Sequence, residues 1–254
     1  MSAWIDCPHP SPIIFDVEGL SAHWARLHRG DAEPLPTQPD LLQAWALFHN
    51  GEFQRATHAA LLLGDAGTNL ANKATCIYAN YLEPSEQRRE ALLLEAAVRA
   101  EALQSRQPDN PGAWYWQAYA LGRYSQGISV AKALANGLGA RIKGALEKAI
   151  ERAPHHADAH LALATFHAEV IDKVGHLIGR MTYGATAEAG LALYRRAHSL
   201  NPDSIVTLTE HARGLLMLQG RRQLGTAAEL QARAAAIEPM DAMEQIYLAA
   251  ARAQ

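Results

Sequence analysis

A short phrase that recurs in the second half of the chain constrains the fold more than any other feature of the sequence. An alanine precedes a proline by five positions three times, at Ala149 and Pro154, Ala197 and Pro202, and Ala234 and Pro239. A looser copy ends at Pro108. Apolar residues at helical spacing lead up to each proline, and proline ends a helix because it lacks an amide donor and clashes with the preceding turn. The phrase therefore predicts a repeating unit that closes with a helix.

Helix-start signals follow these prolines closely. Asn110 before Pro111 is a capping residue followed by proline at the first helical position, and Asp241 with Glu244 forms a capping-box pattern. The apolar content is of the helix-forming kind, since 50 alanines stand against 18 valines and isoleucines. We therefore expect an all-α fold in which helices alternate with short turns.

Three stretches share one arrangement of large, small and proline residues. They carry it at Trp114, Ala118, Leu121, Ala149 and Pro154; at His160, Ala164, His167, Tyr194, Ala197 and Pro202; and at Ala212, Ala227, Ala234 and Pro239. This arrangement resembles the tetratricopeptide repeat (TPR), a unit of 34 residues with a large residue at position 4, small residues at 8, 20 and 27, and proline at 32. A more degenerate unit passes through Ala44 and Ala56. The resemblance implies a right-handed α-solenoid of TPR-like helix pairs.

The resemblance divides the chain into three parts. Residues 1–37 are expected to form an N-terminal arm with one amphipathic helix, residues 38–240 an array of about four units, and residues 241–254 a helix that caps the last apolar face. A short echo supports the helix in the arm, because residues 24–31 match residues 45–52 at an offset of 21. A chance match in an alanine-rich helical chain is the alternative.

Two units are longer than the repeat allows. The prolines at 108, 154 and 202 are 46 and 48 positions apart, and the excess over 34 lies at about residues 123–140 and 170–184. Both insertions have apolar residues at steps of three and four, so each is predicted to extend a helix and add a short amphipathic one. They either pack on each other and on their own repeats, or they wall a cavity or offer an apolar surface to a partner or second subunit.

Charge narrows the classes of partner. The net charge of −3 gives none of the global positive field expected of a protein that binds nucleic acid through phosphates, so we expect no nucleic-acid partner. Residues 110–146 nevertheless contain no acid and four basic residues, Arg123, Lys132, Arg141 and Lys143. They would attract an acidic ligand, unless they only keep helix faces solvated.

The motifs of catalysis are missing from the sequence. It contains no H-E-x-x-H, Walker A or G-x-S-x-G motif, and its two cysteines are 69 positions apart. We therefore expect a protein that is not an enzyme, with no cofactor and no metal; His156, His160 and His167 are interpreted as structural. The N-terminus lacks a signal peptide and no stretch has 18 uncharged apolar residues, which favours a cytoplasmic protein without membrane insertion.

The resemblance also implies a binding surface, because the first helix of each TPR lines a concave groove. Carried over position by position, the groove residues are Trp45, Phe48, Tyr115, Tyr119, Arg123, Leu161, Thr165, Glu169 and Arg213. This lining is aromatic and apolar, which suits a binding hot spot. We expect a non-catalytic scaffold that binds a peptide segment or protein partner there. A small-molecule carrier whose insertions close an apolar pocket, and self-association through the insertions, are the alternatives.

Overall fold

The computed structural model describes residues 3–253, and within that range it contains helices and no strand. The α-helices are α1 (Val17–Leu27), α2 (Pro39–His49), α3 (Phe53–Leu62), α4 (Thr68–Tyr81), α5 (Glu86–Arg106), α6 (Pro111–Gln126), α7 (Val130–Ala135), α8 (Leu138–Arg152), α9 (Ala157–Tyr183), α10 (Ala187–Leu200), α11 (Ile205–Gln219), α12 (Leu224–Ala235) and α13 (Ala242–Arg252). The predicted all-α fold and its right-handed solenoid of TPR-like helix pairs are confirmed.

Within residues 39–235 the helices form five antiparallel pairs, whereas the sequence predicted about four units. The additional pair is α4 and α5, which follows the repeat pattern poorly. Residues 68–79 of α4 are buried on every side, and they include Asn69, Asn72 and Lys73. Because these polar residues occupy core positions, the apolar spacing that identifies the other units is interrupted in α4.

The predicted helix starts are formed by side-chain caps. The Asn110 side chain accepts from the amide of Ala113 at 3.3 Å, with Pro111 in the first helical position of α6. The Asp241 side chain accepts from the amide of Glu244 at 2.7 Å at the start of α13. These bonds satisfy amides that have no partner within their own helices.

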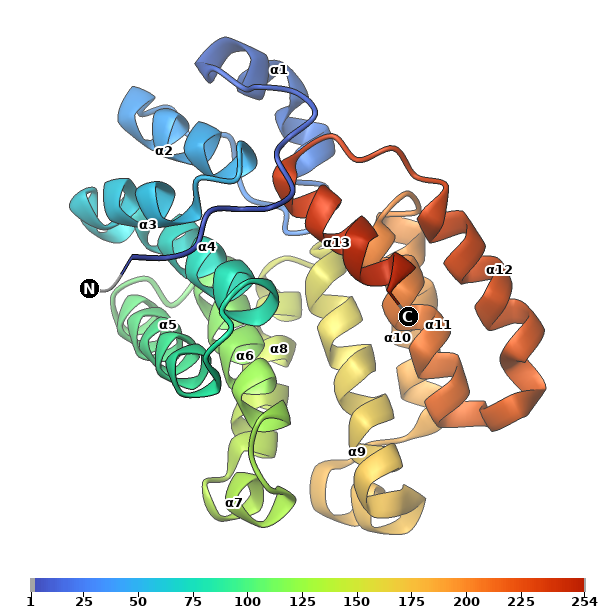
Figure 1. The fold of residues 1–254 in the computed structure, drawn as a ribbon. Coiled ribbons are helices and arrows are strands. Elements are labelled where there is room, and N and C mark those ends of the chain that lie inside the picture. Colours follow the sequence, from blue (N-terminus) through green and yellow to red (C-terminus); the bar gives the residue numbers. More distant parts are fainter. Residues whose placement is uncertain (1–2, 254) are drawn as a thin grey trace.

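The first helices and the start of the last helix meet across the mouth of the solenoid. Figure 1 shows α1, the N-terminal segment and α13 together at one end of the curve. Arg26 on α1 donates to Glu244 on α13 at 2.6 Å, and His49 at the end of α2 contacts Asp241 at 2.6 Å. α13 thus packs on α11 and α12 and also reaches α2, which closes this end of the groove.

A chain of buried polar side chains holds this closed end, and we call it the closure network. It runs from Asp241 through His49 and His28 to Asp31 and Lys73, with successive contacts of 2.6, 3.2, 2.9 and 2.6 Å. All five residues are buried. The network joins the arm, the first two helix pairs and the last helix through hydrogen bonds rather than apolar packing alone.

The protons of the closure network can be counted from its hydrogen bonds. The carboxylates of Asp31 and Asp241 accept from the Nδ1 atoms of His28 and His49, and the bond between the two Nε2 atoms needs one further proton. Three protons on two rings carry one positive charge. Together with the Lys73 ammonium, this charge balances the two carboxylates, which is the condition for burying charged groups at tolerable cost.

The two insertions form the opposite end of the molecule. In the first, α6 runs on to Gln126 and the short α7 follows; in the second, α9 runs to Tyr183 with a sharp bend at Gly175 (φ 81°, ψ 164°). They pack closely, because a Cβ atom at Gly139 would lie 2.3 Å from the Tyr183 ring. Figure 1 places α7 and the far end of α9 together at the edge remote from α1.

No helix between residues 3 and 253 is both long enough and apolar enough to cross a bilayer.

Candidate functional site

The concave face contains a cavity of about 110 Å³ between α6, α9, α11 and α13. Four tyrosines line it: Tyr81, Tyr115, Tyr119 and Tyr247. They come from three different parts of the chain, since Tyr81 ends α4, the central two lie on α6, and Tyr247 lies on α13. The tyrosines are brought together only because α13 folds back into the groove, where the rings of Tyr247 and Tyr81 lie 5.4 Å apart.

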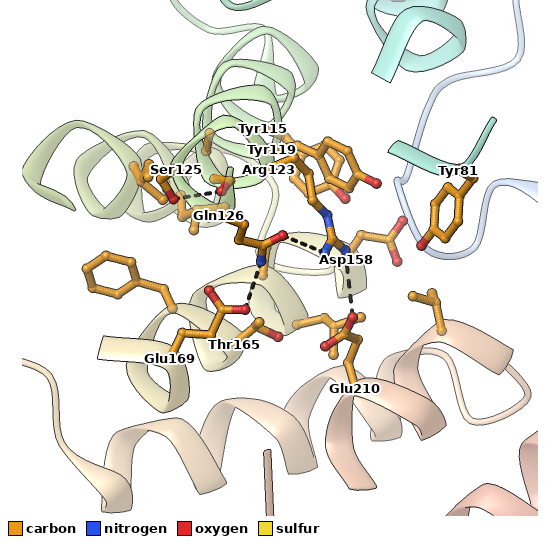
Figure 2. A pocket seen from close by; sticks show the side chains of 18 of the residues that line it. Tyr81, Tyr115, Tyr119, Arg123, Ser125, Gln126, Asp158, Thr165, Glu169 and Glu210 are labelled. Carbon is orange, nitrogen blue, oxygen red and sulfur yellow. Dashed lines mark hydrogen bonds and ion pairs between the residues drawn. The ribbon is translucent and has the colours of Figure 1, made fainter. Parts of the chain in front are cut away.

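A closed circuit of polar contacts crosses this cavity, and we call it the polar ring; Figure 2 shows the part of it formed by Arg123, Gln126, Glu169 and Glu210. Arg123 donates to Gln126 at 3.2 Å, and Gln126 donates to Glu169 at 2.8 Å. Arg213 lies 3.6 Å from Glu169 and 3.8 Å from Glu210, and Arg123 lies 3.6 Å from Glu210. The three ion-pair distances exceed the 2.7–2.9 Å of a well-formed charged hydrogen bond. The polar ring is therefore electrically balanced but loosely held.

Arg123 is the chemical centre of the polar ring. Its guanidinium carbon lies 5.2 Å from the centre of the Tyr119 ring, a cation–π distance. Burial alone would lower the pKa of Arg123, but Tyr119, Tyr81 and Glu210 raise it well above its usual value. The cation is therefore permanent, and an anion that enters the cavity would meet it.

Two further groups in the cavity, the Tyr119 hydroxyl and the Asp158 carboxyl, can form additional hydrogen bonds. The Tyr119 hydroxyl is buried and makes no well-formed hydrogen bond to any residue in the range 3–253, although Arg123 and Tyr81 lie near it. Asp158, at the first turn of α9, lines the cavity, and burial together with the Asp31 charge raises its pKa to about 7. An unpaired buried hydroxyl costs stability, so a ligand that bonds to it recovers an interaction that the free protein lacks.

A second cavity of about 90 Å³ adjoins the first and lies between the two insertions. It shares four lining residues with the first cavity: Ser125, Ile142, Phe166 and Glu169. The remainder of its lining is mostly apolar and includes Val130, Leu134, Val174 and Tyr183. The insertions therefore extend the binding surface away from Arg123 instead of filling the groove.

The structure brings together most of the groove residues that the sequence predicted. Those that line the cavity are Tyr115, Tyr119, Arg123, Leu161, Thr165 and Glu169. Arg213 borders it through its two contacts in the polar ring. Tyr115 is almost fully buried, so it supports the wall more than it offers a surface.

Trp45 and Phe48 are not part of this cavity, and the expectation that they line an open groove is wrong for them. Both are fully buried in the first helix pair. The physical reason is that α1 covers the concave side of this pair, where Trp24 packs edge-on against Trp45 at 5.5 Å. The Lys73 ammonium also lies over the Trp45 ring at 5.3 Å and over the Phe48 ring at 5.1 Å. Trp45 and Phe48 therefore lie where the sequence placed them along the repeat, but the N-terminal arm of the protein covers this part of the groove.

The polar and tyrosine residues of the site that sequence reasoning missed include Tyr81, Gln126, Asp158, Glu210 and Tyr247. Glu210 lies one helical turn before Arg213, so the groove register of α11 could have revealed it. Tyr81 ends α4, which was not recognised as the partner of the helix that closes before Pro108. Tyr247 was assigned to a capping helix, and only the return of α13 into the groove places it in the cavity.

The predicted histidines all bond to nearby backbone. His156 caps α9 by accepting from the amide of Ala159 at 3.2 Å, and His167 accepts from the amide of Thr186 at 3.0 Å. A ring nitrogen of His160 lies 3.0 Å from the carbonyl oxygen of Pro154. Within residues 3–253, no group of three or more His, Cys, Asp and Glu side chains is arranged to hold a metal ion.

Comparison with known proteins places this site in a repeat fold. The family model described as "Regulator of microtubule dynamics protein 1-3" matches residues 65–248. The crystal structure of TTC0263, a thermophilic TPR protein of Thermus thermophilus, is similar with a TM-score of 0.59 and 17% identity, over 85% of this chain and 98% of that one. Curated protein sequences gave no significant match.

Human IFIT1, solved as a dimer with m7Gppp-AAAA, is a more distant structural relative. Its TM-score is 0.45 and its identity 14%, over 89% of this chain and 58% of that one. The same protein with PPP-AAAA gives a TM-score of 0.43.

Proposed function

The chain belongs to the family of regulator of microtubule dynamics proteins 1-3, and from this premise we propose that it is a non-catalytic binding protein that holds a segment of a protein partner in the concave cavity. The observation that carries the proposal is the polar ring around Arg123, with the unpaired Tyr119 hydroxyl beside it. Loosely held ion pairs and a buried hydroxyl without a well-formed hydrogen bond are more typical of a ligand-binding site than of a structural core.

The polar ring specifies the chemistry of that segment. Arg123 and Glu210 lie 3.6 Å apart, so a partner carboxylate that reaches Arg123 at hydrogen-bond distance would replace a weak contact with a stronger one. Tyr119 and Tyr247 both line the cavity and add aromatic surface to it. We therefore expect a segment with an acidic group next to an apolar or aromatic side chain.

The size of the cavity limits how much of the partner enters. A helix with its side chains is about 10 Å across, and α13 already occupies much of the groove where such a helix would lie. An extended segment that inserts one or two side chains fits the remaining space of about 110 Å³ better.

A small-molecule carrier is the second candidate, and one observation favours it. The cavity between the insertions adjoins the polar ring, so the two together suit a slender ligand with an acidic end and an apolar body. Arg123 would hold the acidic end, while Val130, Leu134 and Val174 would contact the body.

A displayed peptide library panned on the pure protein tests the first proposal. Peptides that combine an acidic and an apolar residue should be enriched, and Arg123→Gln should abolish their binding. Arg152→Gln is the matched control, because Arg152 stacks on Trp114 at 5.3 Å outside the cavity, as Arg123 stacks on Tyr119 within it. Peptides that bind Arg123→Gln as well as the natural protein would refute this site.

Native mass spectrometry of gently purified protein separates the two candidates. A retained mass of a few hundred daltons that disappears in Arg123→Gln would support the carrier. A bare chain that binds the selected peptides would support the interaction protein.

A further inference from the structure

Five large apolar side chains are exposed at the end of the molecule remote from α1 and α13. Val130 and Leu134 on α7 are 43% and 47% exposed, and Leu177, Ile178 and Met181 at the end of α9 are 72%, 56% and 79% exposed. We call residues 128–139 and 172–183 the insertion tips. Residues of both tips line the cavity between the insertions, so the two tips are neighbours.

The outward direction of these side chains follows from the bend in α9. After Gly175, Gly179 is buried, and a Cβ atom there would lie 3.2 Å from Val170 and 3.7 Å from Ala185. The helix therefore presses its Gly179 side against the protein. Leu177, Ile178 and Met181 lie on its free side, where no described residue covers them.

Basic residues accompany the apolar ones. Lys132, Lys173 and Arg180 are exposed on the insertion tips, and none of the three forms an ion pair with a carboxylate in the range 3–253. Asp172 is the single acid among residues 128–139 and 172–183. The tips are thus positively charged in a chain whose net charge is −3.

We propose that the insertion tips dock on an anionic lipid surface. Leu177, Ile178 and Met181 enter the headgroup region, and Lys132, Lys173 and Arg180 lie against the lipid phosphates. Apolar side chains ringed by lysine and arginine are the chemistry of proteins that lie on membranes without spanning them. The exposed apolar side chains supply contact with lipid, and the positive charge supplies attraction to the anionic surface.

A second copy of the chain is a poorer occupant. Each partner of a specific protein interface contributes about 20–30 residues, and the five exposed apolar side chains of the tips are few beside that number. Tips that met each other would also bring like charges together. Charge complementarity therefore favours an anionic lipid surface over self-association.

Vesicle flotation tests the proposal with the whole protein. The natural chain should float with vesicles of phosphatidylcholine and phosphatidylserine in equal parts, and it should stay in solution with phosphatidylcholine alone. Replacing the two cations in Lys173→Gln/Arg180→Gln should weaken partitioning about 25-fold, at about fivefold for each charge. Leu177→Ser/Met181→Ser should weaken it about tenfold or more.

Matched controls keep the result specific to the tips. Leu62→Ser/Val98→Ser removes two apolar side chains that are 76% and 65% exposed elsewhere, and Arg221→Gln/Arg222→Gln removes two exposed cations far along the chain. Both controls should float like the natural protein, and circular dichroism should show unchanged helicity in all variants.

A separate variant reports insertion directly. The tryptophan of Met181→Trp, read against the unsubstituted chain, should shift its emission to the blue on anionic vesicles. Failure of the natural protein to float with either vesicle would overturn the proposal, as would tip variants that float unchanged. A concentration-dependent mass in sedimentation that the Leu177→Ser/Met181→Ser variant abolishes, with no flotation, would assign the tips to self-association instead.

Discussion

The closed end of this molecule and its insertion tips are built from opposite chemistry. At the closed end, two histidines, two aspartates and a lysine are buried. Their hydrogen bonds include the contact between His49 and Asp241, which are 192 positions apart in the sequence. At the insertion tips, leucine, isoleucine and methionine side chains face outward. The comparison teaches that polarity alone does not decide which side chains are buried in this protein. Polar side chains are buried where they join helices that are distant in sequence, and apolar side chains are exposed where no other helix covers them.

The closed end tolerates its charges because each one has a partner. Burial would raise the pKa of Asp31, but His28 and Lys73 hold it well below its usual value. Burial lowers the pKa of His28 to about 4 despite its aspartate partner. Neutrality is kept by the whole closure network and is lost when one member is removed.

Removal of Asp241 should break the closed end most severely. Asp241→Ala leaves the fully buried His49 ring without its carboxylate partner and removes the cap of α13, so we expect a loss of about 3–5 kcal/mol in the free energy of unfolding. Asp241→Asn can keep the cap and should lose less. Urea unfolding followed by circular dichroism measures both, with the exposed Asp203→Ala as control. Equal stability of Asp241→Ala and the natural chain would refute a role for this contact in closure.

The same truncation should have different effects at the two ends. Leu20 on α1 is fully buried, so Leu20→Ala should lower the free energy of unfolding by about 2–5 kcal/mol. Leu177→Ala on the second insertion tip should change it by less than about 0.5 kcal/mol, because that side chain already contacts solvent. Similar losses at both positions in urea titrations would show that the tips are packed in solution.

The pH dependence of stability should reveal the buried carboxyl that lies between the closed end and the cavity. The folded pKa of Asp158 is about 7, above the unfolded value of 3.8, so the folded state binds this proton more tightly. Its contribution is therefore most favourable below about pH 4 and is lost as the pH rises to about 7. Asp158→Asn should gain on the order of 4 kcal/mol over the natural chain across that window.

The difference between the two unfolding curves isolates Asp158 from other titrating groups. Burial lowers the pKa of His28 and His156 to about 4. Their contributions to the free energy of unfolding therefore have the opposite pH dependence to that of Asp158, since they are lost as the pH drops below 6.5. These contributions are common to both proteins. Curves for Asp158→Asn and the natural chain that stay parallel from pH 4 to 8 would contradict the assignment.

The smallest expected effect concerns two tyrosine hydroxyls. The Tyr194 hydroxyl donates to Thr165 at 3.3 Å, and Tyr194→Phe should cost about 1 kcal/mol of unfolding free energy. The Tyr119 hydroxyl makes no well-formed hydrogen bond, so Tyr119→Phe should cost less stability than Tyr194→Phe yet weaken binding of the selected peptides about tenfold. A destabilised Tyr119→Phe would mean that this hydroxyl has a structural partner.

The sequence predicted the helices well where the repeat is regular. Asn110, Pro154, Pro202 and Asp241 mark helix ends because capping and proline geometry act within a few residues. The looser copy that ends at Pro108 marks the end of α5. Its partner α4 was missed because core positions of α4 hold polar residues whose partners lie elsewhere in the chain. A pattern within a few residues of α4 does not show that Asp31 and Glu33 are the partners of its polar residues.

The candidate site could be predicted only in part, for a similar reason. Tyr119, Arg123 and Glu169 follow from repeat positions, whereas Trp45 was misplaced because no local signal shows that the arm covers it. The offset of 21 between residues 24–31 and 45–52 was a signal of that contact. It places Trp24 on Trp45 and His28 on His49, so the echoed residues are partners in space.

Closure also changes how such a molecule should unfold. An open solenoid is quasi-one-dimensional: each repeat contacts its neighbours, and the array can fray from either terminus. Here contacts that span 192 and 218 positions tie the first helices to the last one. The end repeats therefore lose their independence, and the array gains the all-or-none cooperativity of a globular domain at the cost of slower, more non-local folding.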